Sequence, residues 1–165
     1  MSVYQDQLHI PLIIKYPHQK GAHVEDAPAS LVDLMPTVLS IVGLKSPVRL
    51  SGINLLDPES RTVRTLLGES YPHPIYLSLH PRFRRVDRAA IRWPYKWIRG
   101  TAGTRELYDL AGDPQETRNL YNSKHPAVET LDAELRRWLS RAHRAEPLQP
   151  DRETLQRLKS LGYTQ

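Results

Sequence analysis

Three histidines near the N-terminus are the first residues whose type could support chemistry. His9, His18 and His23 fall within one short segment. Imidazole nitrogens bind zinc, but a zinc site needs ligands at characteristic spacings, and this spacing matches no such signature and has no obvious acidic fourth ligand. We therefore expect surface histidines here and assign no metal ligand.

Two aspartates in the stretch ELYDLAGDPQETRNL are candidates for a general acid and base. That work requires a cleft that shifts the pKa values of Asp109 and Asp113. Asp113 precedes Pro114, however, and an aspartate in that place commonly starts a turn by accepting hydrogen bonds from nearby backbone N–H groups. We predict that Asp113 stabilises a turn and that Asn119 fixes the end of the same loop, so that the stretch is structural and not catalytic.

A cluster of basic and aromatic side chains is the third pattern with a chemical use. Arginine binds sulfate or phosphate oxygens through two parallel hydrogen bonds, so such a cluster suits an anionic polymer. Aromatic residues of short strands also pack in cores, and arginines line solvated sheet edges, so a structural role fits as well. The cluster comprises His80, Arg82, Arg84, Arg85, Arg88, Arg92, Lys96 and Arg99, with Phe83, Trp93, Tyr95 and Trp97.

Composition excludes several classes of function for this chain. Its 165 residues contain no cysteine, which excludes disulfides, thiolate nucleophiles and thiolate metal ligands. No Gly-x-Ser-x-Gly motif marks an activated serine, and no apolar run approaches the roughly 20 residues that cross a bilayer. The net charge of +5 permits an anionic partner, but no nucleic-acid-binding motif occurs. We expect neither nucleic acid nor a membrane as partner.

The N-terminal part predicts one strand and one helix. Leu8–Pro17 is mostly apolar and rich in isoleucine, as in a strand buried on both faces of a parallel sheet. Ser30–Leu44 predicts a helix with Asp33 as its cap, Pro36 in its first turn and Gly43 at its end. One strand of this type cannot form a sheet alone, so we expect it to have neighbours in a larger α/β domain. The apolar face of the helix comprises Leu34, Val38, Ile41 and Val42.

The rest of the chain predicts short strands followed by helices. Apolar runs separated by proline and glycine predict four antiparallel strands at 74–80, 88–93, 95–100 and 105–110, after a short helical turn within 61–70. Apolar residues at helical spacing then predict two helices. The first contains Val128, Leu131, Leu135, Trp138, Leu139 and Ala142, and the second contains Leu155, Leu158 and Leu161 and stops at Gly162.

These elements predict an α+β fold in three parts. Residues 1–46 form the terminal strand–helix unit of an α/β domain, and residues 47–73 are connecting loops. Residues 74–165 form a C-terminal subdomain with a small four-stranded antiparallel sheet and packing helices.

Several segments, taken in order, resemble the C-terminal portion of the type I, formylglycine-dependent sulfatases, which are the arylsulfatase-like members of the alkaline phosphatase superfamily. YQDQLHIPLIIKYP is similar to the apolar strand that follows the last catalytic motif of that family. ASLVDLMPTVLSIVGL is similar to its D-x-x-P-T helix, and AAIRWPYKWIRG to one of its hairpins. ELYDLAGDPQETRNL is the most specific match, and LKSLGY is a common ending. The resemblance covers essentially the whole chain.

The resemblance implies a hydrolase of sulfate esters. In such enzymes a formylglycine, made in a C/S-x-P-S/T-R motif, attacks sulfur, and a calcium ion held by aspartates stabilises the developing charge. This chain contains neither that motif nor the family's aspartate-rich metal motifs, so no catalytic or metal residue can be transferred to it. Calcium and formylglycine are implied only for the complete parent enzyme.

The expected role is therefore that of a C-terminal fragment, inactive alone, which supplies scaffold and one wall of the substrate cleft. His80, Arg82 and Arg85 are the candidates for that wall. The expected partners are the missing N-terminal sulfatase portion and a sulfated substrate. The alternative is a stand-alone basic module that binds sulfated or phosphorylated polymers, and the sequence leaves the cellular compartment open.

Overall fold

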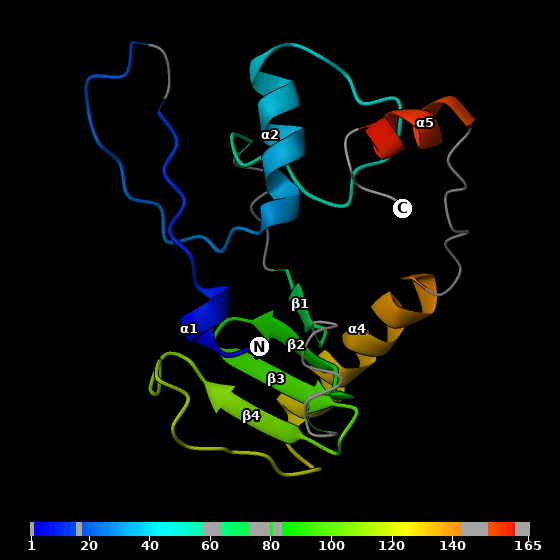
Figure 1. Cartoon of the computed structure of the whole chain (residues 1–165). Coiled ribbons are helices and arrows are strands. Elements are labelled where there is room, and N and C mark those ends of the chain that lie inside the picture. The colour runs from blue at the N-terminus through cyan, green and yellow to red at the C-terminus, as the bar shows by residue number, and fades with distance from the viewer. Residues whose placement is uncertain are drawn as a thin grey trace. The chain divides into compact units, whose positions relative to one another are not determined.

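A computed structural model describes residues 2–15, 18–57, 64–72, 80, 84–142 and 152–160. Four strands form an antiparallel sheet in the order β1-β2-β3-β4 (Figure 1). The strands are β1 (Leu66–Ser70), β2 (Asp87–Arg92), β3 (Tyr95–Gly100) and β4 (Arg105–Asp109). The α+β fold and the four-stranded antiparallel sheet are thus confirmed. Consecutive strands pair with one another, and short hairpin connections join β2 to β3 and β3 to β4.

The first strand of the sheet is not the one that the sequence predicted. The strands expected at 88–93, 95–100 and 105–110 form β2 to β4, but the helical turn expected within 61–70 is wrong, because Leu66–Ser70 is β1. β1 pairs with β2 from Leu66 opposite Ile91 to Ser70 opposite Asp87. This cross-strand pairing overrides the weak local preference of the segment. Of the strand expected at 74–80, residues 74–79 lie outside the described residues, and His80 has no strand conformation.

One face of the sheet packs against the N-terminal segment. Ala89 of β2 lies opposite Ile98 of β3, so both side chains point to this face. They form a buried cluster with Val3, Tyr108 and Leu110, against which Tyr4, Leu8 and Ile91 also pack. The short helix α1 (Gln5–Leu8) lies in this segment. Residues nearly one hundred positions apart in the sequence therefore share a core.

The opposite face of the sheet carries helix α4 (Pro126–Ala142). The indole Nε1 of Trp97, on β3, donates a hydrogen bond of 3.2 Å to Oδ1 of Asp132. Leu131 and Leu135 are 2% and 0% exposed, because the apolar stripe of the helix is turned inward. The helix predicted from this stripe is confirmed. The second predicted helix is α5 (Arg152–Ser160), which is also confirmed, while Leu161 and the predicted stop at Gly162 lie outside the described residues.

The strand predicted at Leu8–Pro17 is not formed. Leu8 ends α1, and residues 9–15 have no strand pairing, while Tyr16 and Pro17 lie outside the described residues. A strand is stable only when a neighbour accepts its backbone hydrogen bonds, and none of the strands described here lies beside this segment. The side chain of Ile13 is 90% exposed.

The predicted helix at Ser30–Leu44 is present as a 3-10 turn, η1 (Leu31–Asp33), that continues into α2 (Leu34–Ile41). Gly43 follows with φ of +69°, the left-handed conformation that commonly ends helices. Residues 1–135 and 136–165 form two separate compact units. None of the described helices has the length and apolar character needed to cross a membrane.

Candidate functional site

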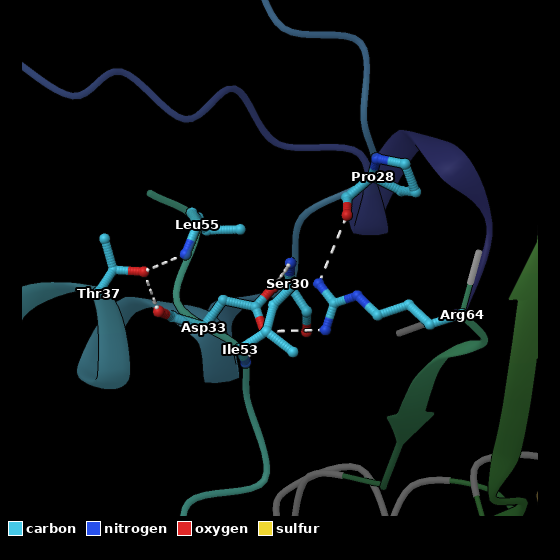
Figure 2. A network of polar contacts seen from close by, with 7 residues as sticks. All are labelled: Pro28, Ser30, Asp33, Thr37, Ile53, Leu55 and Arg64. Atoms are coloured by element: carbon cyan, nitrogen blue, oxygen red, sulfur yellow. Dashed lines mark hydrogen bonds and ion pairs between the residues drawn. The ribbon is translucent and has the colours of Figure 1, made fainter. Parts of the chain in front are cut away.

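A buried aspartate organises the region around α2 (Figure 2). The carboxylate of Asp33 is 0% exposed and accepts hydrogen bonds from the backbone N–H groups of Ser30, at 2.7 Å, and Ile53, at 2.9 Å. The guanidinium of Arg64 donates to both carboxylate oxygens, with an Nη1–Oδ1 distance of 2.9 Å. Burial by itself would raise the pKa of Asp33, but these hydrogen bonds outweigh it and lower the pKa below its ordinary value.

Thr37 extends this network to the next loop. Its hydroxyl donates to the backbone oxygen of Asp33 at 2.6 Å and accepts from the N–H of Leu55 at 2.9 Å. The D-x-x-P-T motif therefore ties α2 to residues 53–55. Asp33 is the N-cap residue of α2, as predicted, but its side chain makes no capping bond to α2. The carboxylate instead closes a capping box with Ser30 at the start of η1 and joins this wider network. The motif is structural.

Close packing at Gly52 gives a testable consequence. A Cβ atom at Gly52 would lie 2.0 Å from the backbone oxygen of Val32, which cannot move without breaking the turn. We expect Gly52→Ala to lower the free energy of unfolding by about 1–3 kcal/mol, the usual cost of overpacking. Gly21→Ala is the matched control, because a Cβ at Gly21 meets nothing within 4 Å. Urea unfolding followed by circular dichroism measures both, and equal midpoints for the two variants would contradict the packing.

The loop after β4 is held as the sequence predicted. The carboxylate of Asp113 accepts hydrogen bonds from the backbone N–H groups of Arg118, at 2.8 Å, and Thr117, at 3.1 Å. These bonds, that of Arg118 first, lower the pKa of Asp113. Asn119 Oδ1 accepts from the N–H of Leu107 at 3.0 Å and so fastens the end of the loop to β4. The turn role of Asp113 and the docking role of Asn119 are confirmed.

The same loop carries a buried ion pair that the sequence analysis missed. Glu116 Oε1 lies 2.6 Å from Nζ of Lys96, and the two side chains are 3% and 0% exposed. The other carboxylate oxygen of Glu116 accepts a hydrogen bond from the backbone N–H of Gln5. Burial lowers the pKa of Lys96, and the contact with Glu116 opposes that shift. Side chains alternate between the two faces of a strand, and Lys96 lies two residues from Ile98 on β3. This spacing could have predicted that Lys96 points to the same buried face as Ile98.

Two tyrosines share one carboxylate beside this ion pair. The hydroxyl groups of Tyr4 and Tyr108 donate to Oε2 of Glu106 at 2.8 and 3.2 Å. Burial, followed by the hydrogen bond to Glu106, raises the pKa of Tyr4 to about 12. Burial and the negative charge of Glu106 also raise the pKa of Tyr108. The neutral phenols are therefore the form that the folded state favours.

These raised pKa values make stability depend on alkaline pH. A phenol has a pKa of about 10 when unfolded, so the contribution of Tyr4 is complete below pH 10 and is lost as the pH rises toward about 12. We expect the free energy of unfolding to fall across that window, and to fall less in Tyr4→Phe. Tyr71→Phe is the control, since Tyr71 is 57% exposed. Urea titrations measure the free energy of unfolding at each pH. If it falls equally steeply with pH in Tyr4→Phe and in the unsubstituted chain, the raised pKa of Tyr4 does not contribute to stability.

Most of the basic cluster is engaged in ion pairs on the sheet and beside it. Arg88 contacts Glu69 at 2.6 Å, Arg92 contacts Glu134 at 3.4 Å, and Arg99 contacts Asp132 at 3.2 Å. Of the three candidates for a cleft wall, Arg85 contacts Asp87 at 2.9 Å and His80 is exposed, while Arg82 lies outside the described residues. Pairing with carboxylates reduces the positive charge that this surface offers to an anion.

The carboxylates and histidines of the described residues do not fit a metal ion. No group of three or more metal-binding side chains is found among them. The buried carboxylates of Asp33, Asp87 and Glu116 are each paired with an arginine or a lysine. His9, His18 and His23 are all exposed.

An apolar stripe on η1, α2 and the residue after α2 is exposed among the described residues. Because the polar network holds the other side of this helix, its apolar residues face outward. Leu31, Met35, Val38 and Val42, spaced by four, three and four residues, are 67%, 58%, 52% and 57% exposed. Farther toward the N-terminus, Ile10, Leu12 and Ile13 are also exposed. Soluble monomers rarely expose contiguous apolar surface of this kind, so such a stripe marks an interface.

Comparison with known proteins gives a consistent result. A protein-family model described as "N-sulphoglucosamine sulphohydrolase, C-terminal" matches residues 1–145. Arylsulfatase K of Xenopus laevis is 30% identical over 149 residues, which cover 82% of this chain and 27% of that protein. Arylsulfatase K of Canis lupus familiaris is 32% identical over 142 residues, with coverage of 82% and 26%. The chain thus spans about a quarter of the length of these curated relatives.

Among solved structures, the phosphonate monoester hydrolase of Agrobacterium radiobacter is similar to this chain with a TM-score of 0.50. Its sequence identity is 22%, and the match covers 67% of this chain and 24% of that one. At this identity the likeness shows a shared fold and nothing about the reaction.

Proposed function

Because the chain belongs to the family of sulfatase C-terminal domains, we propose that it forms the C-terminal part of a sulfuric ester hydrolase. In this proposal the chain supplies scaffold and lacks the nucleophile and the metal ligands, so that it does not turn over sulfate esters alone. Formylglycine and calcium belong to the preceding catalytic portion, which is its partner.

The exposed apolar stripe of Leu31, Met35, Val38 and Val42 carries this proposal. Each of its four residues is at least 52% exposed, and covering them would contribute roughly 25 cal/mol for every Å² of apolar surface removed from water. The helix is fixed from its polar side by the Asp33 network, so it cannot turn its apolar side toward the loop at residues 53–55. A catalytic portion packed over this stripe gives the helix an interior position.

The proposal also assigns a role to His80, Arg82 and Arg85 as one wall of the cleft for a sulfated substrate. The relatives' names, an N-sulphoglucosamine sulphohydrolase and arylsulfatases, support sulfate esters or sulfamates as the substrate class. Arg85 is 45% exposed beside Asp87, so part of its guanidinium can still reach an anion.

The gene itself tests the fragment proposal. We expect the coding sequence directly upstream of Met1 to encode, in frame, a C/S-x-P-S/T-R motif and an aspartate-rich metal motif. An upstream sequence with stop codons in every frame and no such motif would oppose the proposal.

A stand-alone module for sulfated or phosphorylated polymers is the second candidate, and the basic cluster is the observation in its favour. Five of its members are already paired with carboxylates, which favours the scaffold role. A salt series on immobilised heparin distinguishes the two. Elution of the pure chain below physiological ionic strength supports the scaffold, and retention well above it supports the binding module.

A further inference from the structure

The carboxylate of Glu116 joins two segments that lie far apart in the sequence. One oxygen contacts Nζ of Lys96 on β3, and the other accepts the backbone N–H of Gln5, 111 positions away, at 2.5 Å. Gln5 is the first residue of α1, which has no side-chain cap of its own. Glu116 therefore satisfies a helix donor that would otherwise lack a partner. The side chain of Gln5 completes the arrangement, because its Oε1 accepts from Lys96 at 3.3 Å.

The backbone at Glu116 is a second, independent observation. Its φ is +55°, the left-handed region that glycine tolerates and that strains the backbone of other residues. Glycine would remove that strain but would also remove the carboxylate. A glutamate in this conformation indicates that the inward-pointing side chain is what the position requires.

The neighbouring contacts hold the same N-terminal segment. Val3 is buried in the sheet core, Tyr4 donates to Glu106, and Leu8 contacts Gly68 of β1 closely enough that a Cβ there would lie 3.3 Å away. Beyond Leu8 the character changes, since Ile10 and Ile13 are 54% and 90% exposed. The anchored part of the segment thus ends at Leu8.

We propose that Glu116 is a positioning residue: with Lys96, it fixes residues 2–8 on the sheet and so sets where the chain passes from the catalytic portion into the C-terminal part. The consequence for the complete enzyme rests on the proposed function, but the positioning itself does not. A buried ion pair is often no more stabilising than an apolar pair of the same size, so its use here is to select one placement of the segment.

Hydrogen exchange on the full chain tests the positioning. The N–H groups of Gln7 and Leu8 bond to Tyr4 O, and that of His9 bonds to Gln5 O, so these amides report on α1. We expect Glu116→Gln to raise their exchange rates about tenfold or more while the β3 amides change little, because local opening leaves the rest of the fold intact. Glu134→Gln is the matched control, since it breaks an ion pair with Arg92 on the opposite face.

Two further variants keep the test decisive. Lys96→Met combined with Glu116→Gln removes both charges, and we expect it to restore the stability that either single change loses but not the protection of α1. Gln5→Ala removes only the amide beside Lys96 and is expected to raise exchange in α1 alone, even if the single charge variants do not fold. A uniform increase across the sheet, or no increase in α1, would overturn the positioning role.

Kinetic measurements on the complete sulfatase test the consequence for activity. With the catalytic portion present, we expect Glu116→Gln to lower kcat several-fold with little change in KM, whereas Glu134→Gln leaves both unchanged. If kcat is unchanged while exchange in α1 is faster, Glu116 acts only within the C-terminal part. That result would overturn the proposed effect of its position on the catalytic portion. Absence of sulfatase activity in the unsubstituted complete protein would contradict the proposed function and leave the exchange result standing.

Discussion

Replacing Asp33 by alanine is expected to lower the free energy of unfolding by about 3–5 kcal/mol, the usual cost of removing one member of a buried ion pair. The substitution leaves the guanidinium of Arg64 without its carboxylate and the N–H groups of Ser30 and Ile53 without their acceptor. A single buried carboxylate accepts all these hydrogen bonds, so the substitution removes them together (Figure 2).

Urea unfolding followed by circular dichroism measures this loss, and hydrogen exchange at Ile53 locates it. Asp33→Asn keeps one oxygen acceptor and should lose less. Asp26→Ala is the control, because Asp26 is an exposed aspartate seven positions earlier in the chain. A loss below about 1 kcal/mol, the size of a typical exposed ion pair, would show that the network is not what holds α2 in place.

The same carboxylate makes stability depend on acidic pH. The pKa of Asp33 is lowered in the folded chain, so its contribution is present above the ordinary value of 3.8 and is lost as the pH falls through the lowered value. In Asp33→Asn, the free energy of unfolding should depend less on pH in the acidic range. Urea titrations at several acidic pH values measure this change in slope.

Truncating Leu131 is expected to produce the second large effect. Leu131→Ala removes a side chain that is 2% exposed on the inner stripe of α4, and such cavities cost about 2–5 kcal/mol. Trp97 hydrogen-bonds to the neighbouring Asp132, so tryptophan fluorescence should report the loss as a lower urea midpoint. Thr130→Ala is the control on the exposed side of the helix. Equal midpoints for the two variants would mean that α4 is not packed on the sheet.

The sequence predicted those elements whose stabilising contacts are local or periodic. The Asp113 turn and the stop at Gly43 follow from local hydrogen bonds and backbone preferences, and α4 follows from one unbroken apolar stripe. The strand predicted at Leu8–Pro17 was wrong. Its apolar pattern is typical of a strand between two neighbours, and none of the described strands pairs with it. β1 was mistaken for a helical turn because its pairing with β2 is not visible in local propensity.

The candidate site was harder to predict than the fold. Asp33 was singled out, but as a helix cap, because its partners Ile53 and Arg64 lie 20 and 31 positions away. The Glu116–Lys96 pair was missed altogether, because a glutamate in a turn and a lysine between aromatics both read as surface residues. Only the register of β3, which places Lys96 on the same face as Ile98, makes the buried charge predictable.

An aryl-sulfate turnover assay tests the central claim most directly. The pure 165-residue chain is incubated with a chromogenic aryl sulfate, with and without calcium, and then with the catalytic portion that the proposed function requires. We expect no turnover by the chain alone and calcium-dependent turnover when the two portions are expressed together. Calcium-dependent turnover by the pure chain would contradict the account.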